Sequence, residues 1–375
     1  MSTYVLQKED VAPLIEGLAI LGTGGGGSPR WGQAILEKEL AEGREIRIIE
    51  PQDVPDDALI VSGGIMGSVK TLEEMSIEKL LQKWDQRFEL VEAARVMESF
   101  LGRKIDYFIP FEVGGLNTPV VMAAAARMGL QTVDGDALGR SAPETHMTSF
   151  LGHGVSLTPM PLVDACGNAI VVAEQVNPVF ADEIGRWMIT RGGGMGANNH
   201  YPMSGAVLKR AAVPNTVSLA LLIGRKLMAA REKGEDPVAA VAATVKALPL
   251  FKGEISAIEG EDKGGFYITN VALSGMDEFS GREARMVIKN ETMALWIDGV
   301  LRAVFPDLVC MLDPQSGAGI MSVDLVKGKK LCLLGMPCHP RLREGLQNPA
   351  VAEAFGGGRY GHPEITYVPL EELNA

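Results

Sequence analysis

The chain has 375 residues, 46% of them hydrophobic and 22% charged, a composition that excludes an intrinsically disordered protein. Its formal net charge of -12 argues against a nucleic-acid partner, because neutralising phosphates requires clustered Lys and Arg. This length exceeds one compact core, so we expect two domains. The first is an α/β domain over residues 1–165, with helices of 178–248 packed on it, and the second covers 166–375 and is rich in strands from about residue 250.

The sequence carries no sign of a membrane or secretory segment. No apolar run reaches the roughly 18 residues of a membrane span, and the start of the chain lacks the basic and apolar regions of a signal peptide. The four cysteines have no short paired spacing, which favours free thiols over a zinc site or a disulfide framework. We therefore expect a cytoplasmic protein without a membrane partner.

The first part of the chain alternates short β-branched runs with helical segments, which is typical of an α/β domain with a mostly parallel sheet. Helical spacing extends over 76–101, and a second helix is expected from Thr118-Pro119 to Gly129. The expected strands cover 46–49, 58–62, 105–109 and 131–133.

After residue 165 the pattern changes to a hairpin over 162–173 that turns at Cys166-Gly167-Asn168. A long apolar helix over 214–233 stops at Gly234, and Asp236-Pro237 begins another that ends near residue 248. Evenly spaced short strands then predict a domain resembling a β-barrel, with strands over 253–258, 265–273, 285–289, 308–312 and 330–334.

The glycine cluster over 22–27 resembles a nucleotide-binding loop but lacks the Gly-Lys-Ser/Thr ending of a P-loop. The residues before it, 11–21, predict a helix rather than the strand that a dinucleotide fold requires. A flexible connector is the first interpretation, and a loop that contacts a ligand through Gly25 and Gly26 is the second.

Three predicted strands end in loops of unusual composition, namely 63–67, 111–117 and 134–146. Because ligands bind at the carboxyl ends of strands in open α/β sheets, we expect these loops to converge on a site. Gly114 and Gly115 would let the backbone approach a ligand closely, and Asn117 lies at a helix N-terminus that favours anions. Glu112 is either a second site carboxylate or a cap of the following turn.

The loop over 134–146 is rich in ionisable groups: Asp134, Asp136, Arg140, Glu144 and His146 lie within 13 residues. Such groups can bind a proton, a metal ion or a polar ligand, whereas an Asp-Gly-Asp turn can also be a solvated loop. Arg140 either pairs with Glu144 or Asp136 on a helix or binds substrate.

A divalent metal held by Asp134, Asp136 and His146 is chemically sensible, although no known metal-ligand spacing supports it. Arg191, before three glycines, either binds a substrate carboxylate or marks a helix end. His200, in a polar stretch, is a further candidate for the same crevice. The long apolar helix and the acidic charge are compatible with a homo-oligomer.

Four ordered motifs carry a resemblance to a known family: GTGGGGSP (22–29), EVGGLN (112–117), TVDGDALGRSAPE (132–144) and PDLV (306–309). With them the chain resembles the S-methyl thiohydantoin desulfurase-like family along nearly its whole length. The resemblance implies a three-layer α/β domain followed by a barrel-like domain. The chain departs from the family pattern at Asn290-Glu291-Thr292, where an Asn-Glu-Asn run is expected.

The chemistry that this resemblance implies is hydrolysis of an S-methyl thiohydantoin to a hydantoin and methanethiol. Such a hydrolase would need a base to activate water, and Asp134 or Asp136 suits this role if their environments separate their pKa values. His146 is the nearest candidate acid, because imidazole titrates near neutral pH. The alternatives are a cyclic amide or hydantoin hydrolase, or its accessory subunit, and a non-catalytic protein that binds a small ligand.

Overall fold

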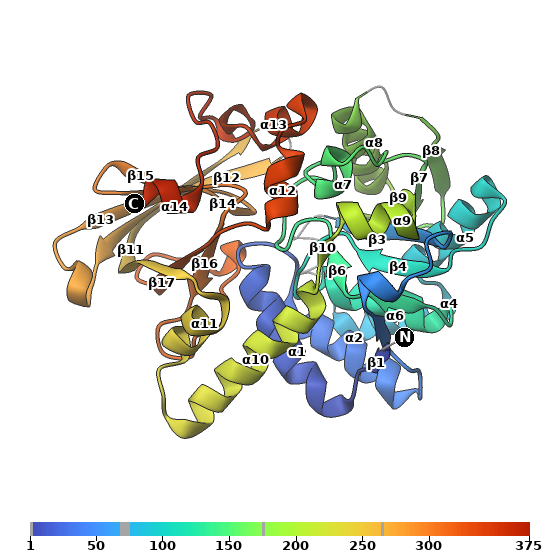
Figure 1. The fold of residues 1–375 in the computed structure, drawn as a ribbon, viewed down its shortest axis with the longest axis horizontal. Helices are drawn as coiled ribbons and strands as arrows, with labels where there is room; N and C mark the ends of the chain where they lie inside the picture. The colour runs from blue at the N-terminus through green and yellow to red at the C-terminus, as the bar shows by residue number, and fades with distance from the viewer. Residues whose placement is uncertain (1–2, 68–75, 175–176, 264–265) are drawn as a thin grey trace.

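The computed structural model describes residues 3–67, 76–174, 177–263 and 266–375. Two halves lie side by side, an N-terminal half with helices on a mixed sheet and a C-terminal half built on a second sheet (Figure 1). The first sheet has the strand order β1-β2-β5-β4-β3-β9-β7-β8. Its strands are β1 (Thr3–Val5), β2 (Arg47–Ile49), β3 (Leu59–Gly67), β4 (Tyr107–Pro110), β5 (Gln131–Val133), β7 (Met160–Asp164), β8 (Ala169–Val172) and β9 (Met195–Ser204).

The predicted α/β class is confirmed, but the first sheet is mixed rather than mostly parallel. The neighbours β2, β5, β4 and β3 run parallel, whereas β1, β9, β7 and β8 pair antiparallel with their neighbours. The physical reason is that β7 and β8 form the predicted hairpin, whose short turn allows only an antiparallel pair. Because β8 and β9 belong to this sheet, the sheet extends past residue 165 to Ser204, and the domain boundary itself stays a prediction.

Helices cover both faces of the first sheet, because successive side chains of β3 point to opposite faces and pack against different helices. Leu59 and Val61 pack against α4, α5 and α6, whereas Ile60 packs in a different cluster with α8 and α9. The predicted helical segment over 76–101 is two helices, because Arg87 and Phe88 have extended backbones. The helices are α1 (Lys8–Leu21), α2 (Pro29–Ala41), α4 (Ile77–Gln86), α5 (Glu89–Leu101), α6 (Asn117–Arg127), α7 (Ser149–Gly152), α8 (Pro178–Arg191), α9 (Gly205–Ala211), α10 (Thr216–Lys233) and α11 (Pro237–Val245).

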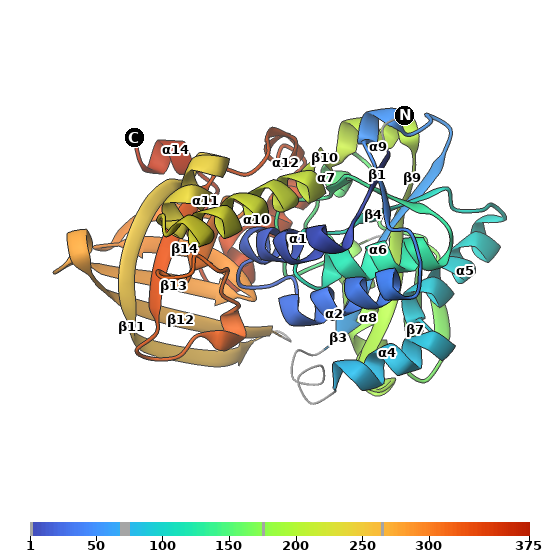
Figure 2. The ribbon, with the colours of Figure 1, turned by 90° about the horizontal axis from the view of Figure 1, so that it is seen from below.

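The second sheet is antiparallel throughout, in the order β15-β14-β13-β12-β11-β17-β16, and it curls into a half-barrel (Figure 2). The prediction of a barrel-like second domain is thereby confirmed, although the predicted strand over 265–273 begins outside the described residues. Its strands are β11 (Leu248–Lys263), β12 (Phe266–Gly275), β13 (Glu283–Lys289), β14 (Glu291–Ile297), β15 (Val300–Val304), β16 (Leu308–Leu312) and β17 (Lys330–Met336).

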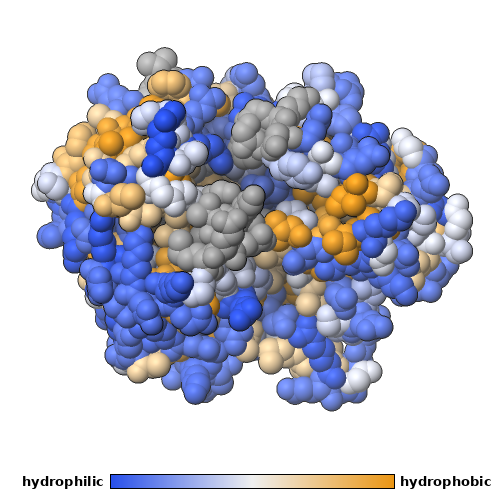
Figure 3. Space-filling model, turned by 180° about the vertical axis from the view of Figure 1, so that it is seen from behind, coloured by the Kyte–Doolittle hydropathy of each residue, from blue (hydrophilic) through white to orange (hydrophobic). Residues whose placement is uncertain are grey.

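Short elements complete the fold, and several of them lie at the junction of the two halves (Figure 1). A small two-stranded sheet joins β6 (Gly135–Asp136) to β10 (Val213–Pro214), which ties the loop after β5 to the start of α10. The chain ends in α12 (Pro340–Gly345), α13 (Pro349–Phe355) and α14 (Leu370–Leu373). Among the described helices, none combines the length and apolar character needed to cross a bilayer. Seen from behind, the surface is mainly hydrophilic, with patches of hydrophobic side chains on both halves (Figure 3).

The two halves share their hydrophobic cores. One cluster joins Phe150 and Met147 of the first half to Met293 and Phe305 of the second. Another joins α1 and α10, which lie side by side in Figures 1 and 2, to the buried face of β16. The orientation of the halves is therefore fixed by continuous apolar packing.

Two glycines set the distance between α1 and α10. A Cβ added to Gly17 would lie 1.7 Å from the carbonyl oxygen of Ala220, and one added to Gly224 would lie 1.7 Å from that of Pro13. Each position therefore accepts only hydrogen, because the partner is rigid backbone.

We expect Gly17→Ala and Gly224→Ala each to lower the free energy of unfolding by about 1–3 kcal/mol, since the added methyl group forces the helices apart. Urea unfolding of the purified variants measures the change. Gly358→Ala is the matched control, because Gly358 is exposed and has no atom near the added Cβ. Equal stability of all three variants would contradict this account of the helix contact.

Candidate functional site at the domain junction

The tip of the β13–β14 hairpin reaches from the half-barrel into the first domain. Lys289 and Glu291 are paired in register, and Asn290 between them has a left-handed backbone, with φ of 61°. Asn tolerates this conformation better than most residues, so the turn can be this tight. Lys289, Glu291 and Thr292 are all buried, which places the polar tip inside the molecule.

The glycine loop over 22–27 packs around this tip. A Cβ added to Gly24 would lie 2.8 Å from the carbonyl oxygen of Asn290, and one added to Gly25 would lie 1.8 Å from Oε1 of Glu291. The amide of Gly24 also donates to the carbonyl of Ile320, at 3.0 Å. The loop is thus held by both halves, and its glycines make room for the hairpin.

The second glycine loop interlocks with the first. A Cβ added to Gly114 would lie 2.5 Å from Cα of Gly26, and one on Gly115 would lie 2.8 Å from Cγ of Pro29. The carbonyl oxygen of Gly26 accepts from the amide of Asn117 at 3.2 Å. These glycines therefore serve close contact between loops in this structure, and contact with a ligand stays a prediction.

Glu112 lies buried behind this loop. Its Oε1 accepts from Nδ2 of Asn117 at 2.5 Å, and its Oε2 accepts from the amide of Ala142 at 2.6 Å. Burial, followed by the negative charge of Glu291, raises the pKa of Glu112 above its usual range, although both hydrogen bonds act to lower it. Glu112 of the first domain and Glu291 of the second therefore lie close enough at the junction for their charges to interact.

Glu291 and Asp136 are also buried carboxyl groups with raised pKa values. Burial raises the pKa of Glu291, and the positive charge of Arg140 only partly offsets that rise. Burial also raises the pKa of Asp136 to about 7, against the amide donors of Gly139 and Leu138. Near neutral pH this cluster can therefore hold protons that ordinary carboxylates have lost.

A second charged group lies beside the cluster. Glu144 pairs with Lys289 and with Arg359, and its Oε2 lies 3.8 Å from Nε2 of His146. Burial would raise the pKa of Glu144, but Lys289 and then His146 and Arg359 hold it below its usual range. Burial lowers the pKa of His146, so its imidazole is neutral near pH 7.

Arg140 bridges the two halves instead of pairing with a carboxylate one helical turn away. Its Nη1 donates to the carbonyl oxygens of Pro306 and Asp307, at 3.0 and 2.9 Å, and its guanidinium lies 4.3 Å from the ring centre of Phe305. The neighbouring segment is irregular rather than helical, so neither Glu144 nor Asp136 is placed for an ion pair of the predicted kind. The motif residue Arg140 thereby binds the motif over 306–309.

Asp134 is engaged at the start of α10. Its Oδ1 accepts from the amides of Val217 and Ser218 at 2.9 and 3.0 Å, where the helix leaves donors unsatisfied. Across the described ranges, no three His, Cys, Asp or Glu side chains are grouped to hold a metal ion, and the predicted set of Asp134, Asp136 and His146 is therefore not assembled. The side chains of Asp134 and Asp136 accept hydrogen bonds from backbone amides instead, which explains why they do not form the predicted metal site.

The other two predicted residues lie in different surroundings. His200 on β9 is buried, and its ring packs edge-on against Phe111 at 5.4 Å, at the start of the second glycine loop. Burial lowers the pKa of His200 to about 3, so it stays neutral. Arg191 is exposed at the end of α8, above the ring of Trp187, and Gly192 caps the helix, so the helix-end interpretation is confirmed.

Unsatisfied polar atoms gather at the junction. In the described part of the chain, buried atoms without a hydrogen-bond partner include Nη2 of Arg140, both ring nitrogens of His146 and Oε2 of Glu291. Each such group carries a desolvation cost that a polar ligand or an ordered water can remove. This concentration marks the junction as the candidate site.

Glu291 and Lys289 are the members of this cluster that the sequence analysis did not select. In the sequence, Asn290-Glu291-Thr292 is distinguished only by its departure from the family pattern. The available signal was local: an Asn between two charged residues, at the meeting of two β-branched runs, predicts a hairpin with charged residues at its tip.

The raised carboxyl pKa values make the stability of the fold depend on pH. A carboxyl group with a raised pKa in the folded state contributes stability below its unfolded pKa, near about 4, and loses it as pH rises through the folded pKa. We therefore expect the free energy of unfolding to decrease between about pH 7 and about pH 8.5, where most histidines are already neutral and the buried Glu112 releases its proton. Glu112→Gln should show a smaller decrease, because it removes one of these groups.

Urea unfolding at several pH values measures this slope. The exposed Glu254→Gln variant is the matched control and should keep the slope of the natural chain. Identical slopes for all three proteins would show that Glu112 does not hold a proton near neutral pH.

Comparison with known proteins identifies the family and supports the fold. The model of the S-Me-THD-like N-terminal domain matches residues 9–174, and that of the S-Me-THD-like C-terminal domain matches residues 176–370. A crystal structure of a protein from Chromobacterium violaceum is similar in fold, with a TM-score of 0.76 and 21% identity, covering 98% of this chain and 100% of that one. A search of curated proteins gave no match. The two domain models span nearly the whole chain, which therefore belongs to the S-Me-THD-like family.

Proposed function

We propose that the protein is a hydrolase of a small nitrogen heterocycle and that it cleaves an S-methyl thiohydantoin into a hydantoin and methanethiol. Family membership supports this reaction class. The observation that carries the proposal is the meeting of Glu112 and Glu291, one from each domain, in surroundings that raise both pKa values. Two carboxyl groups with shifted pKa values are suited to acid and base work near neutral pH.

The reaction needs one proton acceptor and one proton donor. Water adds to the ring carbon that carries the sulfur, and the C=N bond of that carbon becomes a single bond. The carbon–sulfur bond to the methylthio group then breaks as the C=N bond re-forms, and the proton left on the new hydroxyl oxygen moves to the ring nitrogen to give the hydantoin. In our proposal the ionised member of the pair takes a proton from the water, and the protonated member gives one to the leaving sulfur. Mutual repulsion of two buried carboxylates keeps one of them protonated, so both roles are filled at the same pH.

Other groups at the junction are suited to orient the heterocycle. The neutral imidazole of His146 has two unpartnered ring nitrogens, which can bind ring N–H or carbonyl groups. Nη2 of Arg140 is a further unpartnered donor. We place the acid and the base on Glu112 and Glu291 because the two come one from each domain and the negative charge of Glu291 raises the pKa of Glu112.

Release of free thiol from an S-methyl thiohydantoin tests the proposal directly. We expect turnover by the natural chain, and a loss of about 10²–10⁴-fold in Glu112→Gln and in Glu291→Gln, the range by which a positioned acid or base accelerates a reaction. A chromogenic thiol reagent follows product after the protein's four cysteines are masked. Glu254→Gln, an exposed charge change of the same kind, should keep full activity.

Two outcomes would overturn the proposal. Absence of thiol release by the natural chain would exclude the desulfurase reaction, and opening of a plain hydantoin ring instead would favour a cyclic amide hydrolase. Full activity of both folded variants would exclude Glu112 and Glu291 as the acid and base.

A further inference from the structure

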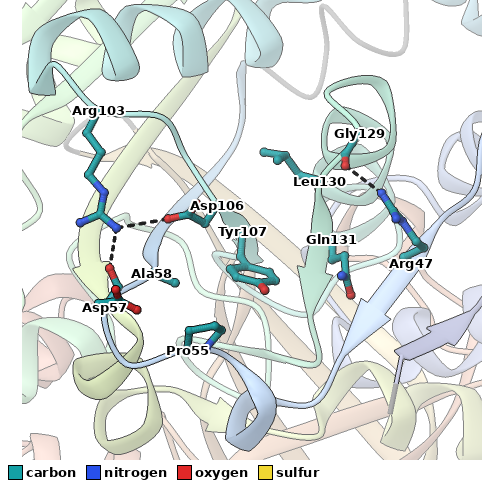
Figure 4. Close-up of a pocket in the computed structure, with 10 residues that line it drawn as sticks. All are labelled: Arg47, Pro55, Asp57, Ala58, Arg103, Asp106, Tyr107, Gly129, Leu130 and Gln131. Atoms are coloured by element: carbon teal, nitrogen blue, oxygen red, sulfur yellow. Dashed lines mark hydrogen bonds and ion pairs between the residues drawn. The ribbon is translucent and has the colours of Figure 1, made fainter. Parts of the chain in front are cut away.

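A separate cavity of about 390 Å³ opens at the amino ends of the parallel strands of the first sheet, the ends away from the junction (Figure 4). Its wall includes the residues at which β4 and β5 begin, Tyr107 and Gln131, together with Arg47 at the start of β2. The loops of the junction follow the carboxyl ends of these parallel strands. A ligand in this cavity would therefore lie across the sheet from the candidate site. The volume falls in the range of small-molecule sites.

The two arginines of the cavity differ in how they are neutralised. Arg103 donates to Oδ2 of Asp106 at 3.2 Å and to the backbone carbonyl of Asp57, as Figure 4 shows. Arg47, on the other side, donates from Nη2 to the carbonyl of Gly129 at 2.7 Å. Within the described ranges no carboxylate lies in ion-pair distance of Arg47. The Arg47 side of the cavity therefore carries a positive charge, whereas both carboxyl groups of the wall, Asp57 and Asp106, lie on the Arg103 side (Figure 4).

The guanidinium of Arg47 also has hydrogen-bonding capacity to spare. Its Nε is buried and makes no hydrogen bond within the residues that the structure describes. A guanidinium offers five N–H donors in a planar fork that matches a carboxylate, and a buried donor left unpaired carries a desolvation cost. A carboxylate at this wall would balance the positive charge of Arg47.

The rest of the cavity offers an apolar surface. Tyr107 lies between the two arginines in Figure 4, and Leu130 and Ala58 also line the space. We propose that this cavity binds a small organic carboxylate, with the carboxylate on Arg47 and the apolar body against Tyr107 and Leu130. This site is independent of the hydrolase proposal, because it shares no residue with the junction.

A fluorine NMR titration of 4-fluorobenzoate into the full chain tests this inference. We expect saturable binding, and binding at least about tenfold weaker for the neutral analogue 4-fluorobenzamide, because a charge-assisted pair with Arg47 is lost. Arg47→Gln should reduce the affinity for the carboxylate by about tenfold or more, whereas Arg47→Lys should keep part of it.

Lys104→Gln is the matched control, because it removes one positive charge from the strongly exposed side chain of Lys104, which is not part of the cavity wall. Its affinity should equal that of the natural chain. The inference fails if the natural chain shows no saturable binding, or binds the amide as well as the carboxylate. It also fails if folded Arg47→Gln, checked by thermal melting, binds 4-fluorobenzoate like the natural chain.

Discussion

The insertion of the Lys289–Glu291 turn into the first domain is the contact on which the rest of the site depends. The left-handed backbone at Asn290 lets β13 and β14 meet in a turn narrow enough to fit between two glycine loops. Gly24 and Gly25 face this turn at distances that leave no room for a side chain. A side chain at Gly24 would collide with the backbone of Asn290, whereas one at Gly25 would displace the carboxyl group of Glu291.

The same turn buries charged side chains away from solvent, where each charge requires a partner. Lys289 meets Glu144, and Glu291 is influenced by Arg140, but Glu112 has only neutral hydrogen-bond donors and a neighbouring carboxyl group of the same sign. Burial of such a group is costly unless it keeps its proton. Protonation of the cluster is thus a consequence of the fold, and the proposed acid and base chemistry uses it.

Local patterns predicted most of the elements but not how they meet. The hairpin turning at Gly167 and the helices α10 and α11 are confirmed because their signals are local. These signals are Gly and Asn at a tight turn, the stop at Gly234 after α10, and the Asp236 cap before α11. The break at Arg87 and the antiparallel addition of β9 were missed, since both depend on packing against distant strands.

The candidate site shows the same limit. Two of the three predicted loops, 111–117 and 134–146, converge around Glu112 and Asp136, as the strand-end rule predicts. The third, 63–67, is not a loop, because these residues continue β3 and pair with β9. Asp134, by contrast, is taken by the amides of a helix that begins about 80 residues later, a contact that no local pattern reveals. Glu291 was missed for a related reason, because its importance arises only when the half-barrel docks on the first domain.

Infrared spectroscopy of the carboxyl groups tests the central claim most directly, because a protonated carboxyl has a C=O stretching band that a carboxylate lacks. The account predicts such a band at about pH 7, well above the ordinary carboxyl pKa values, a loss of the band as pH rises, and weaker bands in Glu112→Gln and Glu291→Gln than in the natural chain. Asp136→Asn separates the remaining contribution of the third carboxyl. Absence of any protonated carboxyl band at neutral pH, or a band unchanged in all three variants, would contradict the account.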